Sequence, residues 1–270
     1  MRKTTAILLS ILAGTVVASC NDDSESGGYG SLAFTFHHFI DGEPAVFNVI
    51  QYTNAAGNEY EVTEVQWFIS DITLKTAGGS KLVLDKKEFA HYVDTNPNRE
   101  YTLSWTIPEK VPAGEYVSIS MTFGIKGEKN KHYIFPDQPE SSMEWPIALG
   151  GENGGYHYMK LNGFWKTPEG ERKPFNFHLG VGQERNEANE ITGFVQNWFE
   201  VELANSGFKL EPGKTATVSL AMNIEEWFVN PHVYDHNQYG GAIMHNQEAM
   251  GKGCENGKNG VFEITAIVVQ

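Results

Sequence analysis

Apolar and polar residues alternate with a period of two along most of the chain after residue 31. This period places successive side chains on opposite faces of an extended strand, so it predicts β-strands with one face turned to a core. Segments rich in glycine and proline, typical of turns, separate the runs. The alternating runs lie at 32–36, 62–69, 71–74, 81–84, 101–107, 116–123, 174–179, 197–203, 215–222 and 261–267.

The pattern favours an all-β fold. Nine or ten strands joined by turn signals predict a single-domain antiparallel β-sandwich over residues 32–270, with long loops. No long amphipathic helix is indicated, and only short helices are expected, near residues 224–229 and 246–250. Neither an internal repeat nor a linker follows residue 31, so one domain is predicted.

Residues 1–19 have the pattern of a bacterial lipoprotein signal peptide. Arg2 and Lys3 form a basic tip, and the apolar stretch 6–18 is too short to span a bilayer stably. Small residues precede Cys20, whose thiol is the nucleophile at the predicted cleavage point. The mature chain is therefore expected to begin at a lipidated Cys20 that anchors it to a membrane.

Residues 20–31 are acidic, rich in glycine and almost free of large apolar side chains, which predicts a flexible tether. An acidic run directly after the lipidated cysteine fits an export signal for surface display, and it equally fits a solvated linker. The expected location is the cell envelope, as an outer-membrane lipoprotein that faces the periplasm or the cell surface.

The chain has a formal net charge of −14, and it lacks basic runs interleaved with aromatic residues. Nucleic acid is therefore not an expected partner. With Cys20 consumed by lipid, Cys254 has no intramolecular partner, so no disulfide is expected. The chain also lacks a nucleophile elbow, a zincin helix, a phosphate-binding loop and a convincing carboxylate pair, and we expect a protein that is not an enzyme.

Nine histidines make metal binding a candidate function. His232 and His236 are four residues apart, but Pro231 and the nearby glycine indicate a loop, so this pair is a weak signature. It fits a pair of surface histidines, and it also fits a metal site completed by His245 or Asp235.

Two histidines on predicted strands are stronger candidates. His178 alternates with the apolar positions 175, 177 and 179, so it is predicted to point away from the core. His38 shares the face of Phe36, where aromatic rings would surround a metal. Two such imidazoles brought together would suit Cu(I), a soft ion.

An alternative is a surface module that binds glycans or peptides without metal. Trp145, Tyr156, Tyr158 and Trp165 lie close together in sequence beside a glycine-rich stretch at 149–155. Exposed aromatic rings there would stack against a ligand, whereas buried ones would belong to the core.

Several motifs follow one another in a recognisable order from residue 32 to residue 270. The chain resembles the MbnP-like family of secreted or surface β-sandwich proteins, typified by the methanobactin-operon copper protein and the copper-repressible surface proteins of methanotrophs. The motifs are FHHFIDG (36–42), YTNAAGN (52–58), WFISDITL (67–74), PAGEY (112–116), MEW (143–145), GYHYMKLNG (155–163), FNFHLG (175–180), EWF (226–228) and NGVF (259–262).

The resemblance implies copper binding through histidines and, in the best-known members, through a tryptophan that a dihaem partner enzyme oxidises to kynurenine. His38 matches the early histidine of the family, and His178 matches a second candidate ligand. The oxidised tryptophan would stand where this chain has Phe36, which cannot become kynurenine. His37, Met143, His157 and Met159 are candidates to compensate. Copper or another transition-metal ion is thus expected to be bound for uptake, storage or handover, with His38, His178, His37 and His157 as candidate ligands.

Overall fold

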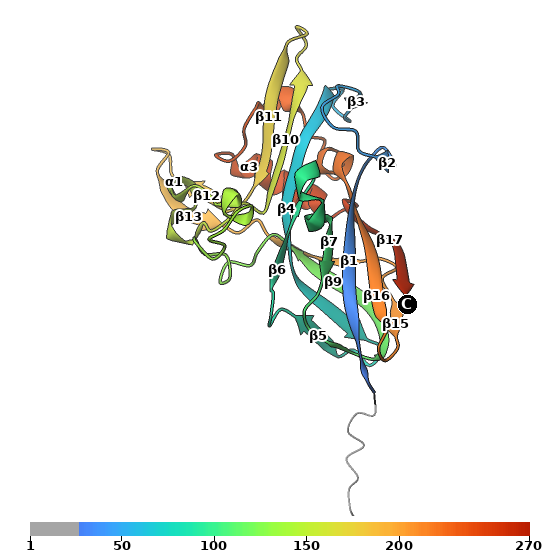
Figure 1. Cartoon of the computed structure of the whole chain (residues 1–270). Helices are drawn as coiled ribbons and strands as arrows, with labels where there is room; N and C mark the ends of the chain where they lie inside the picture. The colour runs from blue at the N-terminus through green and yellow to red at the C-terminus, as the bar shows by residue number, and fades with distance from the viewer. Residues whose placement is uncertain (1–26) are drawn as a thin grey trace, which may run out of the picture.

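The computed structural model describes residues 27–270 and contains two main β-sheets packed face to face (Figure 1). The first sheet has the strand order β17-β16-β1-β2, with β7 and β8 also paired to β1. Its strands are β1 (Tyr29–Ile40), β2 (Glu43–Pro44), β7 (Ser104–Thr106), β8 (Val111–Pro112), β16 (Thr215–Asn223) and β17 (Phe262–Val269).

The second sheet has the order β11-β10-β4-β9-β14 and is built around the long strand β4. The short strands β3, β5 and β6 also pair with β4, and β15 pairs with β9. Its strands are β3 (Tyr52–Thr53), β4 (Glu59–Thr76), β5 (Lys81–Leu84), β6 (Ala90–Asp94), β9 (Gly114–Phe123), β10 (Met159–Lys166), β11 (Arg172–Leu179), β14 (Phe199–Leu203) and β15 (Phe208–Leu210).

A separate hairpin and short helices complete the described fold. The hairpin lies beside α1 to one side of β10 and β11 (Figure 1). It consists of β12 (Gly182–Arg185) and β13 (Ile191–Val195). The helices are α1 (Ile147–Gly150), α2 (His236–Tyr239), α3 (Gln247–Gly257) and the 3-10 turns η1 (Pro97–Leu103), η2 (Glu140–Met143), η3 (Gly151–Asn153) and η4 (Ile224–Phe228).

The prediction of a mostly β fold with only short helices is confirmed, and η4 and α3 begin where short helices were expected. Three details differ. The strands are more numerous than predicted: β2, β3 and β8 have only two residues each, too few for an alternating pattern to appear, whereas β6, β10, β12, β13 and β15 are longer and were missed. The runs 62–69 and 71–74 form the single strand β4, interrupted by Asp71 at a positive φ of 49°. The predicted tether ends early, since Tyr29–Ser31 already belong to β1.

The prediction that the strands pair antiparallel is wrong for one pair. Strands β1 and β16, nearly two hundred residues apart, pair in parallel over nine residues from Ser31 with Thr215 to Phe39 with Asn223. Period-two alternation is the same in both directions, so the sequence pattern could not distinguish them. The direction follows instead from the path that the chain takes through the second sheet.

Both faces of β4 are buried, which decides where polar side chains can lie. Val65, Trp67 and Ile69 join the large core between the sheets. Phe68 points the other way, into a smaller cluster with Tyr92, Met143 and Tyr156. That smaller cluster is covered by the connection between β9 and β10, so the outer face of the second sheet is partly enclosed.

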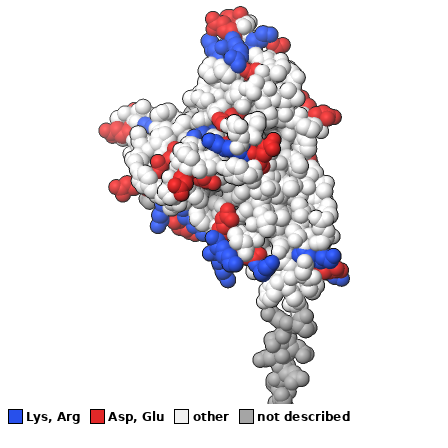
Figure 2. Space-filling view, in the orientation of Figure 1, with Lys and Arg blue, Asp and Glu red and all other residues white. Residues whose placement is uncertain are grey.

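Charged side chains of both signs are scattered over the visible surface, most of which is formed by other residues (Figure 2). On the face shown in Figure 2, Lys and Arg lie beside Asp and Glu and do not gather into one basic area.

Gly163 provides a test of how tightly the second sheet is packed. It lies where β10 shifts register against β4, and a Cβ atom there would stand 2.0 Å from the Glu61 carbonyl oxygen and 2.5 Å from a Phe175 ring carbon. We expect Gly163→Ala to lower the free energy of unfolding by about 2 kcal/mol, and Tm by roughly 4–8 °C. Gly78→Ala is the control, because its Cβ would lie 3.9 Å from the nearest atom. Equal Tm values for the two variants in thermal unfolding would contradict this packing.

Candidate metal centre

The outer face of the second sheet carries a row of polar side chains that crosses three strands. Gln66 on β4 is opposite Lys160 on β10, and Lys160 is opposite His178 on β11. Directly opposed residues in antiparallel strands point to the same face. His178 therefore points away from the core that receives Phe177 and Leu179, as the sequence parity predicted.

Two successive hydrogen bonds through Asn162, the Asn162 relay, determine which ring nitrogen of His178 carries the proton. Asn162 Nδ2 donates to Glu64 Oε2 at 3.2 Å, which turns Asn162 Oδ1 toward the His178 Nε2 atom at 2.8 Å. Because an amide oxygen only accepts, Nε2 must carry the proton and Nδ1 must carry a lone pair. The His178 Nδ1 atom is buried and has no hydrogen-bond partner among the described residues.

His157 approaches the same place from the loop before β10. Glu144 and Tyr156 form an isolated antiparallel bridge, and His157 Nδ1 lies 2.8 Å from the Met143 carbonyl oxygen. Since a carbonyl oxygen only accepts, Nδ1 carries the proton and Nε2 carries the lone pair.

Trp145 holds the other side of the His157 ring. The two rings meet edge to face with their centres 4.6 Å apart. Gly180, at the end of β11, permits this arrangement, because a Cβ atom there would stand 2.4 Å from two carbons of the Trp145 indole. A glycine in the FHLG segment thus makes room for the tryptophan of the MEW segment.

His157 and His178 form the candidate metal centre. Their ring centres are 5.1 Å apart and their planes are nearly perpendicular, at 83°. An imidazole nitrogen stands about 2 Å from a metal that it binds, so the two rings are close enough to share one ion. Within residues 27–270, no cluster of three or more His, Cys, Asp or Glu side chains is arranged to hold a metal.

Burial keeps both imidazoles neutral, which is the form that binds metal. Desolvation, and to a smaller extent the nearby Lys160 ammonium, together lower the pKa of His178 to about 3. The pKa of His157 is lowered well below its usual value, first by desolvation and then by the charges of His178 and Lys160. Proton competition for the two lone pairs is therefore weak at neutral pH.

The structure does not bring His38 and His178 together. His38 Nε2 accepts a hydrogen bond from Trp67 Nε1 at 3.2 Å, and Trp67 packs against Phe36, Phe123 and Phe262 between the sheets. Because Trp67 and Gln66 point to opposite faces of β4, the second sheet lies between His38 and His178. The prediction that His38 shares the face of Phe36 holds. The prediction that His38 and His178 bind one ion requires the two histidines to meet, and this placement does not support it.

His38 has its own environment. Desolvation lowers its pKa to about 4, with a smaller contribution from His37, while Asp94 opposes the shift. His37, the adjacent candidate ligand, is exposed and its ring stacks near Phe39 at 6.3 Å. Neither histidine contacts the His157 ring in the described structure, so of the four candidate ligands only His157 and His178 are neighbours.

The remaining histidines do not assemble into a second metal site. His232 Nε2 pairs with the carboxylate of Glu255, and His245 is exposed. His236 is fully buried at the start of α2, and neither ring nitrogen has a hydrogen-bond partner among the described residues. Its ring stacks on Phe175 at 4.3 Å.

Cys254 lies buried in α3. Its thiol Sγ donates to the Asn197 carbonyl oxygen at 3.2 Å, and burial raises its pKa to about 12. A thiol held in this neutral form is a poor nucleophile and a poor metal ligand.

The aromatic residues proposed for glycan or peptide stacking are all in the interior. Trp145, Tyr156, Tyr158 and Trp165 are between 0 and 5% exposed. They serve as core, and the glycan or peptide alternative loses the surface on which it depended.

The polar supports of the site were missed at the level of sequence. Lys160 and Asn162 alternate with Met159, Leu161 and Gly163, so they share a strand face opposite to the apolar positions. The same parity argument that placed His178 could have placed them. Glu64 gave no such signal, because its link to His178 through Asn162 depends on the register of three strands.

Comparison with known proteins identifies the family. A family model described as MbnP matches residues 29–246. The chain belongs to the MbnP family. Among solved structures, MbnP from Methylosinus trichosporium aligns with a TM-score of 0.45 and 14% sequence identity, covering 71% of this chain and 76% of that one. No curated protein matches.

Family membership confirms the resemblance found in the motif order, and the candidate pair lies within the matched range. The predicted signal peptide, the lipidated Cys20 and most of the tether fall outside the described residues. Within residues 27–270, no helix has the length and apolarity needed to cross a membrane.

Acid sensitivity provides a test of the buried imidazoles. Burial lowers the pKa of His236 to about 3, whereas an unfolded histidine titrates near 6.5. The unfolded chain takes up a proton below pH 6.5 that the folded chain excludes until about pH 3, so stability is lost as pH falls through this range. We expect His236→Phe to reduce the loss between pH 7 and pH 5 by about 2 kcal/mol in urea titrations.

The exposed His245 supplies the control for this measurement. His245→Ala should leave the loss of stability between the two pH values unchanged. A His236→Phe variant whose stability falls as steeply as that of the wild type would show that His236 is not held neutral by the fold.

Proposed function

We propose that this MbnP-family protein binds one copper ion, as Cu(I), between His157 and His178 and holds it for storage or handover. The observation that carries the proposal is the pair of neighbouring imidazoles, each of which has one ring nitrogen committed to a hydrogen bond and the other left with its lone pair. Family membership supports it, because the resemblance to MbnP-like proteins implies copper.

The donor set fits a soft ion of low coordination number. Imidazole suits copper and zinc alike, but protein zinc sites use three or four protein ligands. The described residues supply two imidazoles here and no third His, Cys, Asp or Glu in a metal cluster. Cu(I) accepts such a set, and the Trp145 ring packs edge to face against His157 on one side of the site.

The kynurenine expected from the resemblance has no place in this proposal. Phe36 is buried and packs edge to face on Trp67 at a ring distance of 5.7 Å. It also lies between the sheets, on the other side of the second sheet from His178. The proposed site therefore does not require a dihaem partner to complete its ligands.

We also propose that Cys20 anchors the protein by lipid to the cell envelope, where it faces the periplasm or the cell surface. The supporting observations are the basic tip, the short apolar run and the small residues before Cys20. Retention of copper at a membrane surface agrees with a role in uptake, storage or handover and requires no turnover.

Anaerobic competition for Cu(I) against a chromogenic chelator tests the site. We expect His157→Ala and His178→Ala each to raise the Kd for Cu(I) by more than about 100-fold, because each removes a ligand and not only an outer partner. His38→Ala and His37→Ala are the matched controls and should change the Kd little. Wild type that retains no Cu(I), or loss of binding in His38→Ala alone, would contradict the proposed site.

The Asn162 relay has its own expected effect. Without the Asn162 oxygen, the His178 proton is free to move to Nδ1, which would remove the lone pair from the site. We expect Asn162→Ala to weaken Cu(I) binding by about 10–100-fold, and Asn162→Asp, which keeps an acceptor, to weaken it less. Equal Kd values for the Ala variant and the wild type would exclude a role for this relay.

A further inference from the structure

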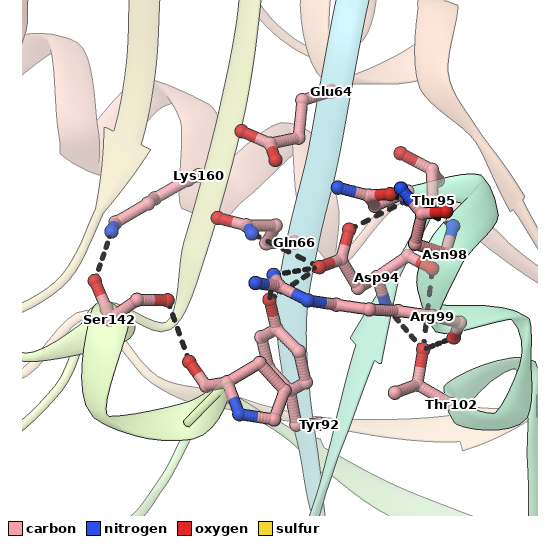
Figure 3. A network of polar contacts seen from close by, with 12 residues as sticks. Glu64, Gln66, Tyr92, Asp94, Thr95, Asn98, Arg99, Thr102, Ser142 and Lys160 are labelled. Carbon is pink, nitrogen blue, oxygen red and sulfur yellow. Dashed lines mark hydrogen bonds and ion pairs between the residues drawn. The ribbon is translucent and has the colours of Figure 1, made fainter. Parts of the chain in front are cut away.

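Lys160 places a positive charge beside the candidate metal centre. It is directly opposite His178 in the pairing of β10 with β11 and points to the same face. Its Nζ atom donates to the Ser142 carbonyl oxygen, one residue before the Met143 carbonyl that holds His157 (Figure 3). The side chain is therefore fixed in the loop that shapes the site.

No carboxylate forms an ion pair with this ammonium among the described residues. Asp94, on the same sheet face, is paired with Arg99 at 2.6 Å. Glu64 lies on the same face (Figure 3). Its carboxylate accepts a hydrogen bond from Asn162. The Glu64 carboxylate acts on this ammonium without forming an ion pair with it, so no contacting carboxylate neutralises the charge of Lys160.

The strand pairing brings this charge close to the two imidazoles. Directly opposed residues such as Lys160 and His178 have Cβ atoms roughly 5 Å apart, and the Lys160 Nζ atom is held by Ser142, beside the residue whose carbonyl holds His157. A positive charge there opposes a metal cation between the two rings. The energy of that opposition grows in proportion to the charge of the ion, so a divalent ion meets twice the repulsion of a monovalent one.

We propose that Lys160 is a specificity-determining residue that makes the His157–His178 site favour monovalent over divalent ions. This inference rests on the proposed function and adds the physical basis of selection between oxidation states. Lys160 holds its Nζ on the Ser142 carbonyl and acts on the ion through its charge alone.

The test compares two redox-inert ions, Ag(I) as the monovalent probe and Zn(II) as the divalent one. Isothermal titration calorimetry on the full mature chain gives the Kd of each ion for wild type, Lys160→Met and Lys160→Arg. Met keeps the length of the apolar stem and removes the charge, while Arg keeps the charge. Circular dichroism and Tm establish that each variant is folded.

We expect Lys160→Met to tighten Zn(II) binding relative to Ag(I) binding by on the order of tenfold, and Lys160→Arg to keep the wild-type ratio. Raising ionic strength should shrink the difference between Met and wild type. An unchanged ratio in Lys160→Met overturns the inference while leaving the proposed function intact. Weaker binding of both ions in that variant also overturns it, since Lys160 would then act as a ligand. Wild type that binds neither Cu(I) nor Ag(I) overturns the proposed function itself, and the inference with it.

Discussion

Burial of both faces of β4, the central strand of the second sheet, is the constraint on which the rest of the structure depends. The pleat of β4 sends Trp67 into the core between the sheets and Gln66 and Phe68 toward the enclosed outer face. A polar side chain on either face must therefore find a partner within the protein. On the outer face this requirement produces the row of Gln66, Lys160 and His178 and the relay through Asn162.

The same constraint places the candidate histidines, which the sequence could not rank, on different sides of the second sheet. Parity along each strand correctly placed His178 opposite to Phe177 and placed His38 with Phe36. Parity could not predict that His38 and His178 lie on opposite sides of the second sheet, because that depends on how the two sheets stack. His157 was only one of several candidates in sequence, and its position beside His178 depends on the bridge between Glu144 and Tyr156.

Fold class was accessible from the sequence because alternation is a local property, and family membership was accessible because the motifs keep their order. The parallel pairing of β1 with β16, the single strand across Asp71 and the helical burial of Cys254 were not accessible. Each of these arises from contacts between segments distant along the chain. The free lone pair on His178 Nδ1 could not be predicted from the sequence for the same reason, since the orientation of Asn162 is set by Glu64 from a third strand.

The placement of Cys254 has a practical consequence for experiments on the protein. Its sulfur is enclosed within α3 and committed to the Asn197 carbonyl. An exposed thiolate would compete with imidazole for soft ions and would cross-link with other thiols. With this sulfur sequestered, a single cysteine introduced at the surface could be labelled selectively with a maleimide dye, without a background from the native residue.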